Sequence, residues 1–306
     1  MPSCRRPFHL ANLFGRQMLL SAQLVLLALA GSPAHAVVGG SGGDPVSTDS
    51  PWSGVGQAEI GNGPRAGQFT GALIGPRLVL TAAHVVHGRP VSEIRFGLPL
   101  QEGRTVTIAA SGVYIHPGFR GVRKGPDGFW HKDLALIELS EPAPAGVPIY
   151  PLARKKDLLK SQVTFVGYGK GGDGMEGATM PGGVRRVGYN RVDVLLGELR
   201  EDGRHSAPDL LLFDFDGPDY ASNRFKPDVP LNSSLGAEAE ATFAVGDSGA
   251  PLFVFEDGRL RLVGVAAFVA GQDGTMGQFG SVAGATLVPA FLDWIRETVR
   301  TAPDGP

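Results

Sequence analysis

Two stretches of this chain have the pattern of a β-hairpin, and the first of them runs directly into a histidine. Residues 68–80 turn at Gly75-Pro76, and residues 252–268 turn at Asp257-Gly258. Apolar segments on both sides of such turn residues predict paired antiparallel strands. Glycine (45) and proline (24) are abundant, which favours short strands joined by turns over long helices. The sequence therefore predicts an all-β fold.

Other segments add detail to this pattern. The apolar segments 134–139 and 163–167 predict further short strands. The stretch that begins at Pro289 has apolar side chains on one face, which predicts an amphipathic helix of about three turns at the end of the chain. Residues 170–183 are rich in glycine, and we expect them to form an exposed, mobile loop.

The first 36 residues have the pattern of a secretory signal peptide. A basic start is followed by the mostly apolar stretch 18–30 and by Ala34-His35-Ala36, a small-x-small cleavage pattern. The apolar stretch is shorter than the roughly 20 residues that cross a bilayer, and the alternative is an uncleaved amphipathic anchor. We expect residues 37–306 to form one mature domain, exported to the periplasm or secreted, without membrane contact after signal removal.

Cysteine content and charge exclude several classes of function. Cys4 is the only cysteine, so the expected mature chain has no disulfide, no thiol nucleophile and no cysteine metal site. Core burial has to hold it together, which its length permits. The net charge is −2 and no basic stripe is visible, so we expect no nucleic-acid partner. No cluster has metal-ligand spacing, and we expect neither metal nor cofactor.

Three short strings carry the chemistry. They are Thr81-Ala82-Ala83-His84, Asp133-Leu134-Ala135-Leu136 and Gly246-Asp247-Ser248-Gly249-Ala250-Pro251. An imidazole, a carboxylate and a hydroxyl are the parts of a nucleophilic acyl-transfer site. Ser248 would be the nucleophile, His84 its base, and Asp133 the group that orients the imidazole.

The glycines around Ser248 allow a tight turn that exposes the hydroxyl. The same turn would aim the backbone N–H groups of Gly246 and Ser248 at one point, as an oxyanion hole. Each catalytic candidate also has an ordinary alternative when taken alone: a partly buried histidine, a turn cap, or a serine in a turn. We expect the other histidines nearby in sequence, His87, His116 and His131, to lie on the surface.

These strings, in this order, resemble the trypsin/chymotrypsin-type serine proteases. The similarity runs from Val37-Val38-Gly39-Gly40 to Asp293-Trp294-Ile295. It implies two six-stranded antiparallel Greek-key β-barrels with a C-terminal α-helix. His84 and Asp133 would come from the first barrel and Ser248 from the second. The implied activity is that of a monomeric serine endopeptidase acting on protein or peptide substrates.

The resemblance also implies an ion pair at the new N-terminus. In this family, a freed Val-Val-Gly-Gly-type end inserts and its ammonium pairs with the aspartate before the serine. Val37 follows directly on the expected cleavage point at Ala36, so signal removal itself would free an ammonium that pairs with Asp247. The alternative is that Asp247 accepts only local backbone hydrogen bonds.

Aligning the chain with this family suggests the residues of the substrate pocket. Thr242, six residues before Ser248, takes the place of the aspartate that binds basic side chains in trypsin-like members. Phe268 and Val269 would lie on the substrate-binding strand and Ala283 on the far wall. Because Val269 stands where glycine is usual, we expect cleavage after small or medium apolar residues. The alternative is an altered loop that repositions these residues.

Departures from the family leave other functions open. Thr70 and Val85 occupy the positions of a family disulfide, Ala267 replaces a serine that supports the aspartate, and extra residues fall within 170–240. The competing functions are a non-catalytic or weakly active binding protein on the same fold, and an esterase-type hydrolase using the same three side chains.

Overall fold

The computed structural model describes seven stretches of the chain. They are residues 37–39, 50–62, 66–100, 104–121, 123–225, 234–271 and 275–301. The expected signal peptide, residues 1–36, lies outside them. Within these stretches, no helix has both the length and the apolar character needed to cross a bilayer.

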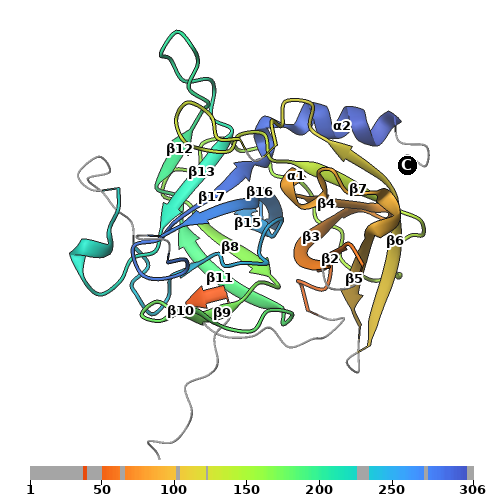
Figure 1. The fold of residues 1–306 in the computed structure, drawn as a ribbon, viewed down its shortest axis with the longest axis horizontal. Coiled ribbons are helices and arrows are strands. Elements are labelled where there is room, and N and C mark those ends of the chain that lie inside the picture. Colours follow the sequence, from red (N-terminus) through yellow and green to blue (C-terminus); the bar gives the residue numbers. More distant parts are fainter. Residues whose placement is uncertain are drawn as a thin grey trace, which may run out of the picture. The chain divides into compact units, whose positions relative to one another are not determined.

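A closed antiparallel barrel forms the first half of the domain (Figure 1). Its strand order is β2-β3-β4-β7-β6-β5, and β5 closes it by pairing with β2. The strands are β2 (Val55–Ile60), β3 (Gly67–Gly75), β4 (Leu78–Thr81), β5 (Ile94–Pro99), β6 (Thr105–Ile115) and β7 (Ala135–Leu139). The predicted hairpin at Gly75-Pro76 is β3–β4, and the first predicted barrel is confirmed.

The second half is an antiparallel sheet of seven strands rather than a closed six-stranded barrel. Its order is β11-β8-β15-β16-β17-β13-β12 (Figure 1). The strands are β8 (Gln162–Gly167), β11 (Arg186–Arg191), β12 (Val194–Leu196), β13 (Leu210–Asp214), β15 (Pro251–Glu256), β16 (Arg259–Ala270) and β17 (Val282–Leu287). The predicted hairpin at Asp257-Gly258 is β15–β16.

A small third sheet corrects the expectation for residues 170–183. These residues form the hairpin β9 (Gly171–Asp173) and β10 (Gly177–Met180), not a loop. β9 pairs in parallel with β1 (Val37–Gly39), and β1 pairs on its other side with β14 (Ala241–Thr242). The long-range pairing with β1 holds the hairpin against the body of the domain.

Helices are few and short among the described residues. α1 (Ala83–Val86) follows β4 directly, and α2 (Leu292–Thr301) confirms the predicted terminal helix. Short 3-10 turns cover Val91–Glu93, Tyr220–Ser222 and Val288–Ala290.

Apolar side chains from both halves form the core. One buried cluster fills the barrel and extends to β16 and α2, and another lies within the second sheet. The predicted all-β class, with its C-terminal helix, is confirmed.

Candidate active site

Ser248 lies in a tight turn whose shape requires glycine on both sides. Gly246 has a φ of +100° and Gly249 one of +84°, in the region that side chains other than glycine rarely adopt. A Cβ on Gly249 would lie 2.1 Å from Thr81 Oγ1 and 2.2 Å from the Thr70 carbonyl oxygen. The turn is therefore fitted closely against the barrel and leaves Ser248 partly exposed.

Thr70 of β3 ties this turn to the first barrel. Its backbone N–H donates to the Ser248 carbonyl oxygen (3.0 Å), and its hydroxyl donates to the Gly246 carbonyl oxygen (3.1 Å). The same hydroxyl accepts the Tyr168 N–H (3.1 Å), and the Thr70 carbonyl accepts the Thr81 hydroxyl (2.8 Å). At a position where the resemblance implies a disulfide, this chain uses a buried hydrogen-bond network.

His84 and Asp133 meet through two hydrogen bonds. His84 lies on α1, just after β4, and its Nδ1 is 2.6 Å from Asp133 Oδ2. The His84 backbone N–H donates to the other oxygen, Oδ1, at 2.8 Å. The Asp133 side chain is 2% exposed and that of His84 is 25% exposed. A buried carboxylate thus fixes the ring while one ring edge reaches solvent.

The second sheet holds the Asp133 backbone. Thr286 of β17 donates its hydroxyl to the Asp133 carbonyl oxygen at 3.0 Å. On the preceding side, Lys132 has a φ of +57°, a backbone conformation that costs energy for a residue other than glycine. Asp133 is thereby placed between the barrel that carries His84 and the sheet that carries Ser248.

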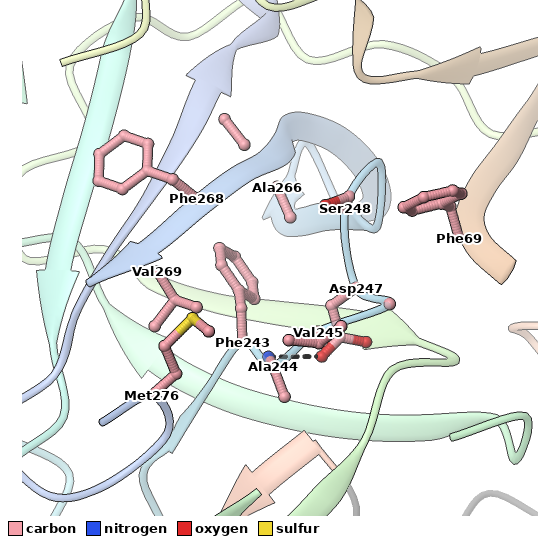
Figure 2. Close-up of a pocket in the computed structure, with 12 residues that line it drawn as sticks. Phe69, Phe243, Ala244, Val245, Asp247, Ser248, Ala266, Phe268, Val269 and Met276 are labelled. Carbon is pink, nitrogen blue, oxygen red and sulfur yellow. Dashed lines mark hydrogen bonds between the residues drawn. The ribbon is translucent and has the colours of Figure 1, made fainter. Parts of the chain in front are cut away.

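Two cavities adjoin these groups. One of about 200 Å³ lies beside Ser248 (Figure 2); the other, about 190 Å³, is lined by His84, Trp130, Asp133, Ala267 and Phe268. The first is lined by Phe69, Phe243, Ala244, Val245, Gly246, Asp247, Ser248, Ala266, Ala267, Phe268, Val269 and Met276. Because Ala267 and Phe268 border both cavities, the serine and the histidine face one continuous wall.

The structure brings two of the four predicted pocket residues to the cavity beside Ser248. Phe268 and Val269 line it. Thr242 and Ala283 are fully buried and line neither cavity. Thr242 lies in β14 opposite Val38 of β1, and Ala283 lies in β17 between β13 and β16. Both lie in paired strands, and their part in a substrate pocket stays a prediction.

Phe243 lines the cavity where Thr242 was expected. Its ring packs against Phe165 and Phe213, with centroids 4.9 and 5.3 Å apart. Sequence reasoning missed it, as it missed Phe69, Met276 and Trp130. Trp130 lies three residues before Asp133, and that nearness was the one signal that pointed to it.

Asp247 is buried beneath the turn. Its carboxylate accepts the N–H of Gly169 (2.8 Å) and of Ala244 (2.9 Å; Figure 2). Burial raises its pKa to about 6, against the opposing effect of these hydrogen bonds and of the Arg186 charge. Arg186 in turn donates to the Gly169 carbonyl oxygen at 3.1 Å. Val37 is also buried and packs in the same apolar cluster as Phe243.

The three histidines expected on the surface differ in exposure. His87 is exposed and His116 is partly buried, between Phe291 and Trp294. For His131 the expected surface position is wrong: the residue is 8% exposed, because two carboxylates enclose its ring. Within the described stretches, no group of three or more His, Cys, Asp or Glu could hold a metal ion.

The chain is similar in sequence to a known protein family and to several known proteins. The family model described as Trypsin matches residues 37–187. Vitamin K-dependent protein C of Mus musculus is 25% identical over 261 residues, which cover 82% of this chain and 49% of the relative. Serine protease SP24D of Anopheles gambiae is 26% identical over 237 residues, covering 75% and 71%.

A shorter match is closer in sequence. Complement C1s subcomponent of Sus scrofa is 36% identical over 95 residues, 29% of this chain and 13% of the relative. The chain spans about half the length of the protein C relatives it matches. With its closed barrel, its second antiparallel sheet and these matches, the chain belongs to the trypsin family of serine proteases.

Proposed function

We propose that this protein is a secreted serine endopeptidase in which Ser248, His84 and Asp133 form the catalytic triad. The observation that carries the proposal is the 2.6 Å bond between His84 Nδ1 and a buried Asp133 carboxylate, beside a cavity wall shared with Ser248. A serine hydroxyl is a poor nucleophile without such a base.

In this proposal each group has its own role. Asp133 keeps the proton on His84 Nδ1, so that Nε2 is free to accept the proton of the Ser248 hydroxyl. Oγ then bonds to the substrate carbonyl carbon, and Nε2 returns the proton to the leaving amine as the peptide bond breaks. Water repeats the steps on the acyl-enzyme and releases the acid. Asp133 stays ionised and stabilises the imidazolium.

An oxyanion hole at Gly246 and Ser248 is supported by the bonds around the turn. The N–H groups of Asp247 and Gly249 donate to carbonyl oxygens of Ala244 and Ala266, both at close range. The N–H groups of Gly246 and Ser248 have no acceptor among the described residues. Two unpaired donors in a rigid turn are suited to a developing negative charge.

An ammonium at Val37, freed when residues 1–36 are removed, is the proposed partner of Asp247. Val37 is buried in the same apolar cluster as Phe243 and Ala250 on either side of the turn, and a cation beside Asp247 would offset the cost of ionising a buried carboxylate. The backbone bonds of Asp247 alone are the competing explanation. Sequencing the N-terminus of active exported protein tests the proposal: a start upstream of Val37 contradicts it.

The cavity beside Ser248 favours small or medium apolar substrate side chains. Its lining by Phe243, Phe268 and Val269 makes it apolar, and the branched side chain of Val269 takes up space that a glycine would leave open. Substituting Val269→Gly should raise kcat/KM for peptides with Leu or Phe before the cleaved bond by about tenfold relative to Ala peptides. Strong turnover of Arg or Lys peptides alone would refute this preference.

A serine-directed phosphonylating probe separates an enzyme from a binding protein on the same fold. Wild-type protein should gain one adduct by mass spectrometry, and Ser248→Ala should gain none. Ser140→Ala, which changes an exposed serine after β7, is the matched control and should label like wild type. Labelling that survives Ser248→Ala refutes the assignment. A peptide-library profile then distinguishes a peptidase from an esterase.

A further inference from the structure

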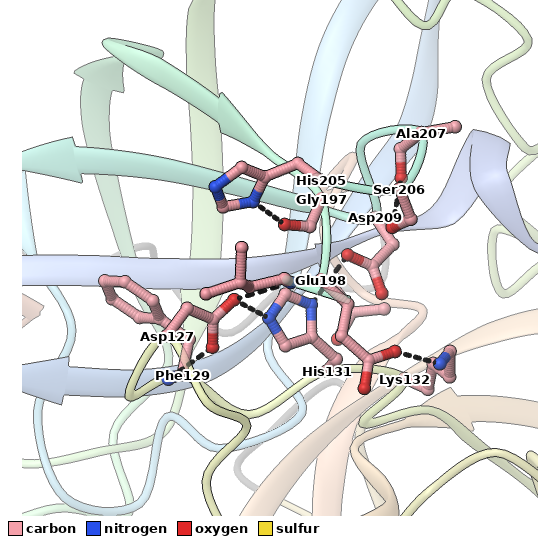
Figure 3. Close-up of polar contacts among 12 residues, drawn as sticks. Asp127, Phe129, His131, Lys132, Gly197, Glu198, His205, Ser206, Ala207 and Asp209 are labelled. Carbon is pink, nitrogen blue, oxygen red and sulfur yellow. Dashed lines mark hydrogen bonds and ion pairs between the residues drawn. The ribbon is translucent and has the colours of Figure 1, made fainter. Parts of the chain in front are cut away.

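His131 lies two residues before Asp133, and two buried carboxylates enclose it. Its Nδ1 is 2.7 Å from Asp209 Oδ1, and its Nε2 is 2.8 Å from Asp127 Oδ2 (Figure 3). The three side chains are 4%, 8% and 7% exposed. The predicted triad uses none of these atoms, so the arrangement needs its own explanation.

Both ring nitrogens face an acceptor, which sets the charge of the ring. A neutral imidazole carries one N–H, so it can serve only one of the two carboxylates. The imidazolium carries two and satisfies both. Burial lowers the pKa of His131, but the hydrogen bonds and charges of Asp209 and Asp127 outweigh it, and the net pKa is raised.

Asp209 anchors the histidine to the second sheet. It directly precedes β13; its N–H donates to the Leu196 carbonyl oxygen (3.0 Å), and its own carbonyl accepts the Leu287 N–H (2.8 Å). Its second carboxylate oxygen is buried and has no hydrogen-bond partner within the described part of the chain. The charge of Asp209 is therefore met by His131.

Asp127 anchors the same ring to the loop before Asp133. Its carboxylate also accepts the N–H of Phe129 (3.1 Å) and of Leu199 (3.3 Å). The next ring in this loop, Trp130, packs with Phe129 against Phe268, at centroid distances of 5.5 and 5.6 Å. The loop thus forms part of the cleft wall beside His84.

Other charged groups surround this site. Lys132 pairs with Glu198, which also pairs with Arg120 at 3.2 Å. The charge of His131 helps to lower the pKa of Glu198, after the bond from Lys132. The pKa of His116 is lowered, chiefly by burial; the charge of Lys132 also lowers it, and the charge of Asp209 raises it. Of these groups, only His131 bonds both to a carboxylate in the loop before Asp133 and to a carboxylate next to β13 of the second sheet.

We propose that His131 is a positioning residue of the protease site, whose imidazolium ties the segment carrying Asp133 to the second sheet, and that loss of its proton loosens this tie. The inference rests on the proposed function, because Asp133 matters through His84. Folding raises the pKa of His131. The stabilisation by its imidazolium is therefore complete below about pH 6.5, the ordinary pKa of histidine, and is lost as pH rises through the raised pKa.

Histidine NMR tests the tie without any activity. In the Ser248→Ala background, ring ¹H–¹³C signals are followed against pH, and the His131 signal is identified by its absence in His131→Gln. We expect His131 to titrate above about 6.5, the His84 ring to shift with the same midpoint, and Asp127→Asn to lower that midpoint. The proposal is overturned if His131 loses its proton at the ordinary histidine pKa, or if the His84 ring signals do not change together with those of His131.

Kinetics test the consequence. For His131→Gln we expect kcat on a peptide substrate to fall about tenfold at neutral pH, by misplacement of Asp133. Asp127→Asn should move the alkaline limb of the kcat profile to lower pH by about one unit. His87→Gln, an exposed histidine outside the site, should keep the wild-type profile. Wild-type kcat and profile in His131→Gln contradict the proposal. An inactive wild type refutes the proposed function, and the NMR titration then still decides the tie.

Discussion

Replacing Thr70 by valine should weaken the protein through two specific hydrogen bonds. The side chain is fully buried in β3, and valine keeps its shape while removing the hydroxyl. That hydroxyl donates to the Gly246 carbonyl oxygen and accepts the Tyr168 N–H, both at 3.1 Å. The substitution therefore leaves one donor and one acceptor without their partner.

The two losses differ in cost. The Tyr168 N–H is buried, and leaving it unpaired costs about 1–3 kcal/mol. The Gly246 carbonyl oxygen is only part-buried, so water replaces the lost donor and the cost is about 0.5–1.5 kcal/mol. Together they lower the free energy of unfolding by about 1.5–4.5 kcal/mol, which corresponds to a fall in Tm of roughly 3–18 °C for a domain of this size.

Thermal unfolding followed by circular dichroism measures this, in the Ser248→Ala background to prevent self-cleavage. Thr70→Ser keeps the hydroxyl and should lose about 1 kcal/mol for its missing methyl group. Thr107→Val, on the exposed side of β6, should change stability by less than about 0.5 kcal/mol. Equal Tm values for Thr70→Val and Thr70→Ser would show that the two bonds do not carry the effect.

Gly249→Ala should lower the free energy of unfolding by more than about 3 kcal/mol, because its Cβ meets Thr81 and Thr70. Gly258→Ala, with similar positive φ but open surroundings, should lose about 1–2 kcal/mol; equal losses in urea unfolding would refute the steric argument. Asp133→Asn should lower kcat about 10⁴-fold with unchanged circular dichroism, because an amide cannot hold the required His84 tautomer; a loss below tenfold contradicts the role. Asp247 has a pKa raised to about 6 by burial, so its contribution to stability is complete below its ordinary pKa near 4 and is lost as pH rises through 6. The Tm of protein that retains Ala36 should therefore fall more between pH 4 and 7 than that of protein beginning at Val37, and parallel curves would argue against the ion pair.

Local signals predicted the elements they can encode. The turns at Gly75-Pro76 and Asp257-Gly258, and the apolar face of the terminal helix, are properties of neighbouring residues, and all three elements were correct. The prediction of a loop for the glycine-rich residues 170–183 failed, because their strand partner is β1, which is far away in the sequence. No local pattern marks such a pairing.

The site divides in the same way. The strings around His84, Asp133 and Ser248 are local, whereas the enclosure of His131 depends on Asp209, 78 positions away. Thr242 and Ala283 line neither of the two described cavities, since an alignment position fixes a residue's number and not the direction of its side chain. Nothing in the sequence around Phe243, the residue after Thr242, indicated a role in the cavity. The structure shows that Phe165 and Phe213 pack against its ring.

Some of the hydrogen bonds that join the two halves also place the predicted triad. Thr70 of the barrel holds the Ser248 turn, and Thr286 of the second sheet holds the Asp133 backbone. None of the described residues is a cysteine, so these links depend on hydrogen bonds and on the charge of His131. Apolar burial lies within each half, and one buried cluster extends from the barrel into the second sheet; this burial outweighs a few hydrogen bonds in total stability. Weakening one link should therefore disturb the alignment of His84, Asp133 and Ser248 before it unfolds either half.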